Sequence, residues 1–207
     1  MNNQGTAEWF NERIGKVTAS RVADILATIK TGESASRANY RWQLVCERLT
    51  GLKEETYTNA SMETGTEREP LARAAYEHLK GVFVTEVGFI PHPSIEMAGA
   101  SPDGIVDVSG DNGLIEIKCP GQNAHGQTLL SKKAPTKYIP QMQMQMASTG
   151  ANWCDFVSYN PTFPDRLQLV VVRVDRDPAF IANMEAEIIK FLAEVTETVD
   201  QLNGSAS

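Results

Sequence analysis

Three charged side chains near the middle of the chain have the types and the spacing for hydrolytic chemistry. Asp103 follows a proline and precedes an apolar run over 105–108, and Glu116 and Lys118 flank Ile117 in a second apolar run. Side chains two residues apart on a strand point to the same face, so Glu116 and Lys118 share a face while Ile117 points into the core. A hairpin between the two runs brings Asp103 back beside them. The sequence therefore predicts two carboxylates and one ammonium in one small space.

The segment that separates the two apolar runs has the composition of a turn. Residues 109–113 read SGDNG, and the Asn-Gly pair at 112–113 is the strongest short-range signal for a hairpin. We therefore expect strands over 105–108 and 114–119, with 112–113 in the turn between them.

Two neighbouring carboxylates repel each other unless a cation lies between them. At about 4 Å and an effective dielectric constant near 20 the repulsion is roughly 4 kcal/mol, which would keep one of them protonated. Mg²⁺ removes the conflict, and its preferred ligands are carboxylate and carbonyl oxygens, here with the carbonyl of Ile117 nearby. A metal ion beside an ammonium is suited to phosphodiester hydrolysis. From spacing alone, an ordinary turn at Asp103 and a solvated strand face at Glu116 and Lys118 are the alternatives.

The composition is that of an ordinary globular domain. The chain has 207 residues, of which 42% are hydrophobic and 22% are charged, and its net charge is −7. This length is enough for one domain with a full core, and we expect a single domain over 1–207 with a disordered tail from about 203. The acidic balance disfavours a protein that coats nucleic acid. A nuclease is compatible with it, because metal-binding carboxylates add negative charge and basic residues can concentrate on one DNA-facing surface.

The sequence gives no support for a membrane span, a secretory signal, a disulfide framework or a zinc site. No apolar run approaches the length of a membrane span, and residues 1–10 lack the features of a secretory signal. Cys46, Cys119 and Cys154 are too scattered for a disulfide framework or a metal site, so we expect reduced, mostly buried thiols in a cytoplasm. The histidines have no ligand spacing, which argues against zinc, and His92 between two prolines is expected to be exposed.

The motifs, taken together, resemble a known nuclease family. P-D followed by E-x-K is the signature of the PD-(D/E)xK nuclease superfamily, and S-P-D-G with E-I-K-C-P is similar to the narrower lambda-exonuclease, or YqaJ-type viral recombinase, family. Three further blocks occur in the family's order: W-x-x-x-R-x-G-x-x-T-A-S over 9–20, G-x-x-x-E-x-x-A over 65–72 and Y-x-x-Q-x-Q over 138–143. The resemblance covers most of the chain. It implies an α/β fold with a PD-(D/E)xK, restriction-endonuclease-like core, in which helices flank a mixed central β-sheet.

The resemblance also assigns roles at the active centre, residue by residue. The implied metal ligands are Asp103, Glu116 and the carbonyl of Ile117. Lys118 and Glu69 would position and help deprotonate the water, and Gln141 would help orient it by a hydrogen bond to the water or to a ligand carboxylate. An ordinary explanation of Glu69 is that an acid in a first helical turn suits the helix dipole. That helix is expected from about Thr66, because Pro70 is tolerated only in a first turn.

The block that contains Gln141 alternates Gln and Met over 141–146, which mimics a half-buried strand. The resemblance implies a helix instead, on which Met142 and Met146 are four residues apart and face the core together. Gln141 is then the site residue by register. Two glutamines are left as surface or helix-packing positions, Gln143 and Gln145.

The resemblance further implies contacts to the 5′ phosphate of DNA from Arg13, Ser20 and Thr18. Arginine is a good phosphate fork, and a hydroxyl with free N–H groups at a helix N-terminus is a good phosphate cradle. Helix capping alone would also explain Thr18 and Ser20. Further candidates for DNA contact are Lys30 and Arg37 in the polar loop 30–38, Met62 as an apolar wedge that parts the duplex end, and Gln143. A plain linker and a buried methionine are the alternatives for the loop and for Met62.

Hydrophobic periodicity predicts the remaining elements. We expect helices over 20–29, 39–50 with Gly51 as its C-terminal stop, a short stretch over 128–132, and a last amphipathic helix after 178. The helix after Thr66 should bury Leu71, Ala75 and Leu79. Strands are expected over 81–90 with a bend at Gly88, and over 152–160 and 167–174 as an antiparallel pair.

The activity that the resemblance implies is that of a Mg²⁺-dependent 5′→3′ exonuclease, with two ions per site and Mn²⁺ as a substitute. It would degrade one strand of linear duplex DNA to 5′ mononucleotides and leave a 3′ overhang. The implied partners are two further copies in a ring-shaped homotrimer and a single-strand annealing protein, in a bacterial host that carries the phage or prophage. Two alternatives stay open: a sequence-specific endonuclease with the same core, and a non-catalytic DNA-end-binding recombination scaffold. The intact set of Asp103, Glu116 and Lys118 argues against the scaffold.

Overall fold

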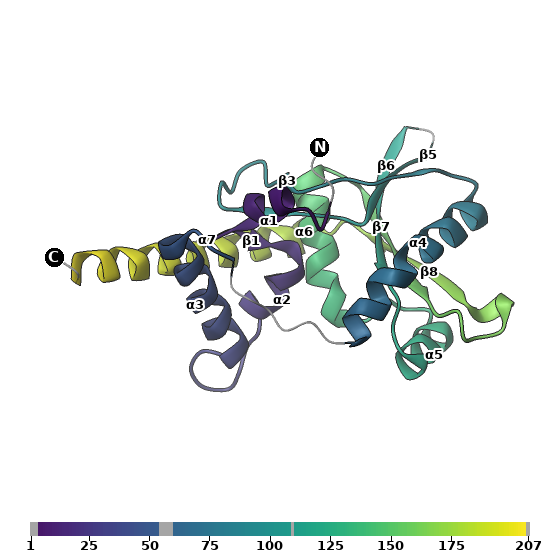
Figure 1. Ribbon diagram of the computed structural model, residues 1–207, viewed down its shortest axis with the longest axis horizontal. Coiled ribbons are helices and arrows are strands. Elements are labelled where there is room, and N and C mark those ends of the chain that lie inside the picture. The colour runs from purple at the N-terminus through teal and green to yellow at the C-terminus, as the bar shows by residue number, and fades with distance from the viewer. Residues whose placement is uncertain (1–3, 54–59, 109, 206–207) are drawn as a thin grey trace.

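A hairpin of two antiparallel strands, β5 (Gly104–Val108) and β6 (Asp111–Lys118), lies at the centre of the molecule. The computed structural model describes residues 4–53, 60–108 and 110–205, except for the side chains of 60–64 and 66. Three more strands extend the hairpin to a five-stranded sheet of order β2-β5-β6-β7-β8 (Figure 1). These strands are β2 (Val84–Thr85), β7 (Trp153–Tyr159) and β8 (Leu169–Asp175). Because β6 and β7 are parallel and the other pairs antiparallel, the sheet is mixed, as predicted.

The hairpin turn lies earlier in the sequence than the Asn-Gly signal suggests. The strand ladder closes at Val108 and Asp111, and Gly110 has φ +85°, a left-handed conformation that glycine adopts without a steric penalty. The turn expected over 109–113 is therefore confirmed at Gly110 but is shorter than predicted, because 112–113 pair within β6. Gly113 is required there for another reason, since a Cβ atom at this position would lie 2.2 Å from the ring of Trp153 on β7.

A second, smaller sheet takes up part of the segment that was expected to be one strand over 81–90. Its order is β1 (Val17–Thr18), β4 (Ala98–Ala100) and β3 (Ile90–Pro91). The expected strand is therefore wrong as a single element. Its first part, β2, pairs with β5 in the large sheet, and its last residue belongs to β3 in the small one.

Helices cover both faces of the large sheet. Helix α4 (Ala60–Lys80) packs through Ala72 and Tyr76 against one face, and α5 (Gln122–Ser131) and α6 (Ile139–Thr149) lie on the other. On that second face, Met142 and Met146 share a core with Phe156. Both Met142 and Met146 are fully buried, which confirms that they face the core together and that the Gln-Met block is a helix.

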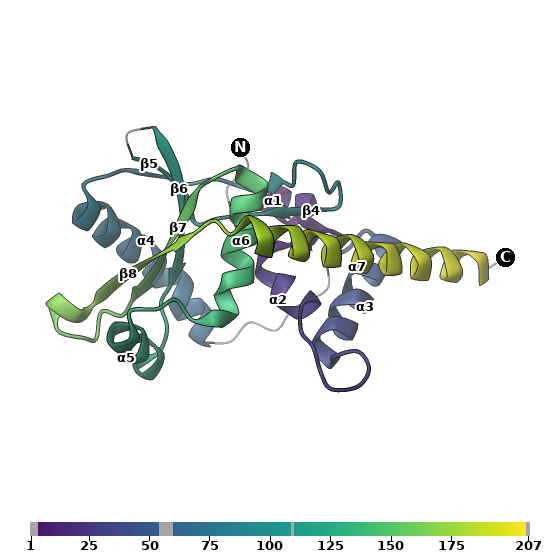
Figure 2. The same ribbon diagram turned by 180° about the vertical axis from the view of Figure 1, so that it is seen from behind.

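The second core lies on the other side of α6, away from the large sheet. Met144 of α6 packs there against α2 (Val22–Ile25), α3 (Ala35–Thr50) and the long α7 (Pro178–Ser205). Figures 1 and 2 both show α6 standing between the sheet and these helices, with α7 projecting away from the sheet. A helix buried on both sides has no wide polar face, which is why its periodicity was ambiguous in the sequence. The remaining short elements are α1 (Ala7–Arg13), η1 (Ala19–Arg21), η2 (Thr136–Tyr138) and η3 (Asp165–Leu167).

Several helix boundaries differ from those expected. The helix expected over 20–29 is only the 3-10 turn η1 followed by α2, and Ile29 is 54% exposed. Helix α4 begins six residues before 66, so Pro70 lies in its interior. α5 runs over ten residues and not only 128–132. The expected end of α3 is confirmed, since Gly51 caps it at φ +68°.

The packed face of α4 is not the one that its leucines suggest. Leu71 and Leu79 are 57% and 60% exposed, whereas Ala72 and Tyr76 are buried against the sheet. The small Ala72 lets the helix approach the sheet closely, and the Tyr76 hydroxyl donates a hydrogen bond of 3.0 Å to Asp155 on β7. The predicted apolar side is therefore wrong for Leu71 and Leu79, whereas Ala75 packs against the core as expected.

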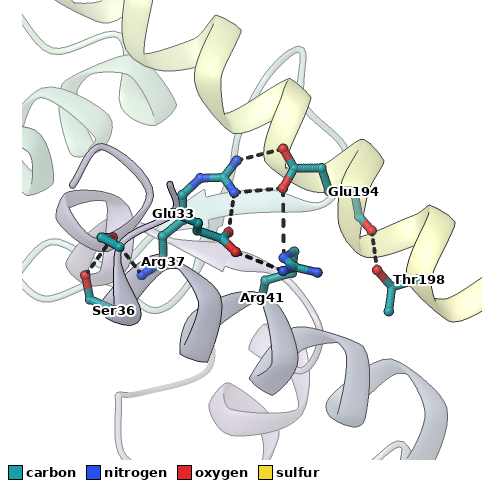
Figure 3. A network of polar contacts seen from close by, with 7 residues as sticks. Glu33, Ser36, Arg37, Arg41, Glu194 and Thr198 are labelled. Atoms are coloured by element: carbon teal, nitrogen blue, oxygen red, sulfur yellow. Dashed lines mark hydrogen bonds and ion pairs between the residues drawn. The ribbon is translucent and has the colours of Figure 1, made fainter. Parts of the chain in front are cut away.

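The loop before α3 is joined to α7 by a network of ion pairs (Figure 3). The guanidinium of Arg37 donates to both carboxylate oxygens of Glu194 at 2.7 and 2.8 Å and to Glu33 at 2.5 Å. Arg41 donates to Glu33 at 2.9 Å. Arg37 thus holds α3 against α7, and its predicted contact to DNA is not supported.

Three further expectations are corrected. His92 is 5% exposed and not a surface residue, because its Nδ1 accepts the backbone N–H groups of Ser94 and Ile95. Of the cysteines only Cys154 is buried, whereas Cys119 is half-buried and Cys46 is exposed. The disordered tail expected from 203 is helical up to Ser205, while 206–207 lie outside the described residues. None of the helices described is long and apolar enough to cross a membrane.

Candidate active site

The hairpin brings Asp103 back to the C-terminal end of β6, beside Glu116 and Lys118, as the sequence predicts. The Asp103 carboxylate accepts a hydrogen bond of 2.6 Å from the backbone N–H of Ile117. Glu116 and Lys118 share one face of the strand and form an ion pair between Glu116 Oε1 and the Lys118 ammonium. Ile117 points to the opposite face, into the core that α4 covers. Two carboxylates and one ammonium therefore lie in one space.

Two glutamines of α6 hold the Glu116 carboxylate from the other side. Gln141 donates to Glu116 Oε1 and Gln145 donates to Glu116 Oε2, both at 2.6 Å. Residues four apart lie on the same face of a helix, so the pair reaches one carboxylate. Glu116 and Gln145 are both fully buried. The contact of Gln141 agrees with its expected place at the site, whereas Gln145 was expected at a surface or packing position. Its spacing of four from Gln141 was the signal in the sequence.

The fourth ionisable residue of the site is Glu69 on α4. Burial raises the pKa of Glu69, although the charge of Arg73 opposes this effect. The charges of Lys118 and Glu116 also act on this carboxyl, which places it at the same cluster. Glu69 Oε1 accepts a hydrogen bond of 2.7 Å from Arg73. Glu67 is exposed and faces elsewhere, as expected from its position two residues away.

The electrostatics of the cluster show an uncompensated pair of carboxylates. Burial and the neighbouring charge of Glu116 raise the pKa of Asp103 well above its ordinary value. Burial alone would lower the pKa of Lys118, but the charges of Glu116 and Asp103 outweigh it and raise that pKa, so the ammonium stays protonated. One positive charge thus faces two acids that are held close together.

This donor set fits a hard divalent cation. Among the residues whose side chains are described, no group of three His, Cys, Asp or Glu residues is arranged as a complete metal cage. Mg²⁺ does not need one, because it keeps several waters and binds through one or two carboxylates. Asp103, Glu116 and the Ile117 carbonyl are the residues that could hold it. Burial first, and then the charge of Glu116, raise the pKa of Asp103, and a bound cation would favour its charged form.

The residues predicted to bind a phosphate line one pocket of about 310 Å³. Arg13, Thr18 and Ser20 all line it, together with three further cations, Lys16, Arg21 and Lys53. Arg13 donates a hydrogen bond of 3.2 Å to Ser101, two residues before Asp103, and its guanidinium lies 3.9 Å from the centroid of the Trp9 ring. Burial lowers the pKa of Arg13 to about 10, so it is still charged at neutral pH. The side chain of Thr18 makes no capping hydrogen bond, which removes capping as its explanation.

The remaining candidates for DNA contact lie apart from this pocket or outside the description. Lys30 is exposed in the loop before α3. Met62 lies in α4, but its side chain is not among those described. Gln143 is 2% exposed, and its amide donates to the carbonyl of Asp175 and accepts from the N–H of Asp177, both at 2.9 Å. Gln143 therefore ties α6 to the start of α7 and is not presented to DNA.

A mixed sheet flanked by helices, with an aspartate and an E-x-K pair on adjoining strands, defines the PD-(D/E)xK class of nucleases. Residues 8–152 match the YqaJ-like viral recombinase domain family, and the chain belongs to this family.

Two solved structures of one relative match nearly the whole chain. The alkaline exonuclease LHK-Exo from Laribacter hongkongensis is 50% identical, with a TM-score of 0.88 over 97% of this chain and 98% of that one. LHK-Exo in complex with dAMP is 51% identical, with a TM-score of 0.90 over the same shares. A phage-related exonuclease from Haemophilus somnus is 15% identical with a TM-score of 0.67, over 93% of this chain and 96% of that one, and supports the fold alone. No curated protein matches the chain. The protein is therefore a YqaJ-like nuclease of the recombinase type.

The Gln145 contact leads to a prediction about metal affinity. In Gln145→Leu, Glu116 Oε2 loses its buried donor, and we expect Mg²⁺ to bind about 10–100-fold more weakly, the typical effect of losing a partner that orients a metal ligand. Isothermal titration with Mg²⁺ in the absence of DNA measures this change. Gln143→Leu is the matched control on the same helix, because Gln143 does not touch Glu116. Equal Mg²⁺ affinities in the two variants would contradict the role of Gln145.

Proposed function

We propose that the protein is a Mg²⁺-dependent 5′→3′ exonuclease that degrades one strand of linear duplex DNA to 5′ mononucleotides. The observation that carries the proposal is the cationic pocket of Arg13, which is joined through Ser101 to the cluster of Asp103, Glu116 and Lys118. Arg13 in this pocket contacts Ser101, which is two residues from Asp103 of the hydrolytic centre. The crystallisation of a relative with dAMP, a mononucleotide, supports the same class of product.

The mechanism follows from the residues of the cluster. Asp103, Glu116 and the Ile117 carbonyl would hold one or two Mg²⁺ ions, with Mn²⁺ as a substitute. Such ions lower the pKa of water and neutralise charge that develops on the phosphate.

Lys118, Glu69 and Gln141 each have a separate role at the site. Lys118, kept protonated by the two acids, places a positive charge beside the attacked phosphate. Glu69, whose pKa is raised by burial, is suited to accept the proton of the attacking water. Gln141 fixes the orientation of Glu116.

The partners are proposed on the basis of the family. A homotrimeric ring would keep the enzyme on one DNA strand, and a single-strand annealing protein would use the 3′ overhang in phage-type recombination. The enzyme would act in the cytoplasm of a bacterial host that carries the phage or prophage. Analytical ultracentrifugation tests the first of these points, with a particle of three chains as the expected result.

The decisive experiment is the digestion of a linear duplex that carries a 5′ phosphate at one end only and labels at both 3′ ends. With Mg²⁺ we expect mononucleotides to be released from the phosphorylated end while the 3′ labels are retained until late, and no release with EDTA. Cuts inside the duplex, or in a closed circular plasmid, would support a sequence-specific endonuclease instead. Binding of ends without any cleavage would support a recombination scaffold.

Arg13→Ala tests the pocket for the 5′ phosphate. Removal of the guanidinium should slow the digestion of 5′-phosphorylated ends about tenfold, the scale of one lost charge-assisted contact, and affect 5′-hydroxyl ends much less. Initial rates on the two substrates measure the ratio. Arg166→Ala, which changes an exposed arginine of η3, is the control. Equal losses on both ends would remove Arg13 from this role.

A further inference from the structure

A second hollow with a cationic lining borders the active site at Lys118. This lysine pocket has a volume of about 410 Å³ and lies between α5, η2 and β7. Its lining includes Lys118, Lys133, Lys137, Tyr138 and Phe156. None of the described residues that line it is acidic. In a chain with a net charge of −7, such a site stands out and is suited to a polyanion.

The composition of the other hollows supports this contrast. The hollow between α7 and the segment 94–97 is lined by three acids, Glu96, Glu197 and Asp200, against the single cation Arg48. The hollow beside the loop before α3 is lined by three glutamates as well. Of these hollows, the pocket of Arg13 and the lysine pocket have cations in excess. Arg13 is hydrogen-bonded to Ser101, two residues before Asp103, and Lys118 of the cluster itself lines the lysine pocket.

Two stacked aromatic rings form the wall of the lysine pocket beside Lys118. The ring of Tyr138 stacks on Phe156, with centroids 5.4 Å apart and planes 25° apart. The ammonium groups of Lys118 and Lys137 lie 5.4 and 4.8 Å from the centroid of the Tyr138 ring. The catalytic ammonium and a pocket ammonium thus both lie beside one aromatic ring, and Lys118 lines the pocket, so the active site is continuous with the pocket.

We propose that the lysine pocket binds the phosphodiester backbone of the cleaved strand on the 3′ side of the scissile bond. The inference rests on the proposed exonuclease function. With the 5′ phosphate in the Arg13 pocket and the scissile phosphate at the cluster, the rest of the strand must leave the cluster along another path. Lys118 belongs to both the cluster and the lysine pocket, so this pocket receives the next phosphates, with Lys133 and Lys137 as their counter-charges.

The test measures the salt dependence of DNA binding in two single variants, Lys133→Gln and Lys137→Gln. Both side chains are exposed, so the substitutions leave the fold intact. Binding of a 5′-phosphorylated linear duplex is followed by fluorescence anisotropy in EDTA at several salt concentrations. The binding constant K falls as salt rises. In each variant the plot of log K against log salt should be less steep by about 0.7–0.9, the loss of one phosphate contact. Lys190→Gln on the exposed face of α7 is the control, with an unchanged slope.

A substrate with one neutral linkage locates the contact along the strand. The wild type should cleave the terminal nucleotide about tenfold more slowly when the linkage immediately 3′ of the scissile bond is a methylphosphonate, because a charge-assisted contact is lost. In Lys133→Gln or Lys137→Gln the neutral linkage should cause a smaller further loss, since the partner charge is already absent.

The outcomes separate the two proposals. Normal Mg²⁺-dependent digestion by the wild type, with slopes and methylphosphonate effects in both variants equal to those of Lys190→Gln, would overturn the lysine pocket and leave the exonuclease standing. Absence of digestion by the wild type would overturn the exonuclease and this inference with it.

Discussion

Replacing Lys118 by alanine should give a folded protein that still binds DNA ends and no longer cuts them. The ammonium is paired with Glu116, and the charges of Glu116 and Asp103 raise its pKa, so it carries a full positive charge at the pH of the reaction. Its loss removes a cation that acts on both acids. We expect a fall in turnover of about 10²–10⁴-fold, the range for loss of a positioned proton-transfer or charge-stabilising group.

Three measurements make the Lys118→Ala prediction specific. Single-turnover digestion in saturating Mg²⁺ gives the rate, anisotropy with a 5′-phosphorylated duplex gives the affinity, and thermal unfolding shows that the fold persists. Lys190→Ala changes a lysine of α7 that pairs only with the exposed Glu187 among described residues, and should behave as the wild type. A Lys118→Ala protein with turnover close to that of the wild type would refute the assignment of the site.

The parts of the site that the sequence predicts are those set by short-range periodicity. Glu116 and Lys118 had to share a face once 114–118 was a strand, and the apolar 105–108 run had to return Asp103 to that strand. The place of Gln141 followed from the resemblance of its block to a known family, because the alternation of Gln and Met by itself favours a strand. Where periodicity and resemblance disagreed, burial of α6 on both sides explains why periodicity misled.

The parts that sequence could not supply depend on partners far along the chain. Helix α4 buries the face of Tyr76, whose hydroxyl donates a hydrogen bond to Asp155 far along the chain. The face of Leu71 and Leu79 is exposed although both residues are apolar. Gly113 looked like a turn residue, but the ring of Trp153 is what requires it. The sequence suggested that Arg37 could contact DNA, but its guanidinium is paired with Glu194, which lies 157 residues further along the chain.

Asp103→Asn should abolish turnover and at the same time stabilise the metal-free protein. Burial and the charge of Glu116 raise the pKa of Asp103 in the folded state above its ordinary value of 3.8. Between these two pKa values the folded state holds a proton that the unfolded chain has released, so the stability of the metal-free wild type falls as pH rises through this window. Asparagine removes the charge and keeps an oxygen for the N–H of Ile117. In EDTA at pH 8 we expect a gain in unfolding free energy of roughly 1–3 kcal/mol.

The same substitution should reverse this order when Mg²⁺ is added. A cation that binds only the folded wild type stabilises it by about 2.7 kcal/mol at a concentration 100-fold above its Kd, whereas Asp103→Asn lacks one ligand and gains much less. Urea unfolding with EDTA and with Mg²⁺ measures both differences. Asp107→Asn is the matched control, because Asp107 is exposed on β5, four residues after Asp103, and accepts from the Gly110 N–H. If Asp103→Asn is less stable than the wild type in EDTA, or gains as much from Mg²⁺, then Asp103 is neither a strained acid nor a metal ligand.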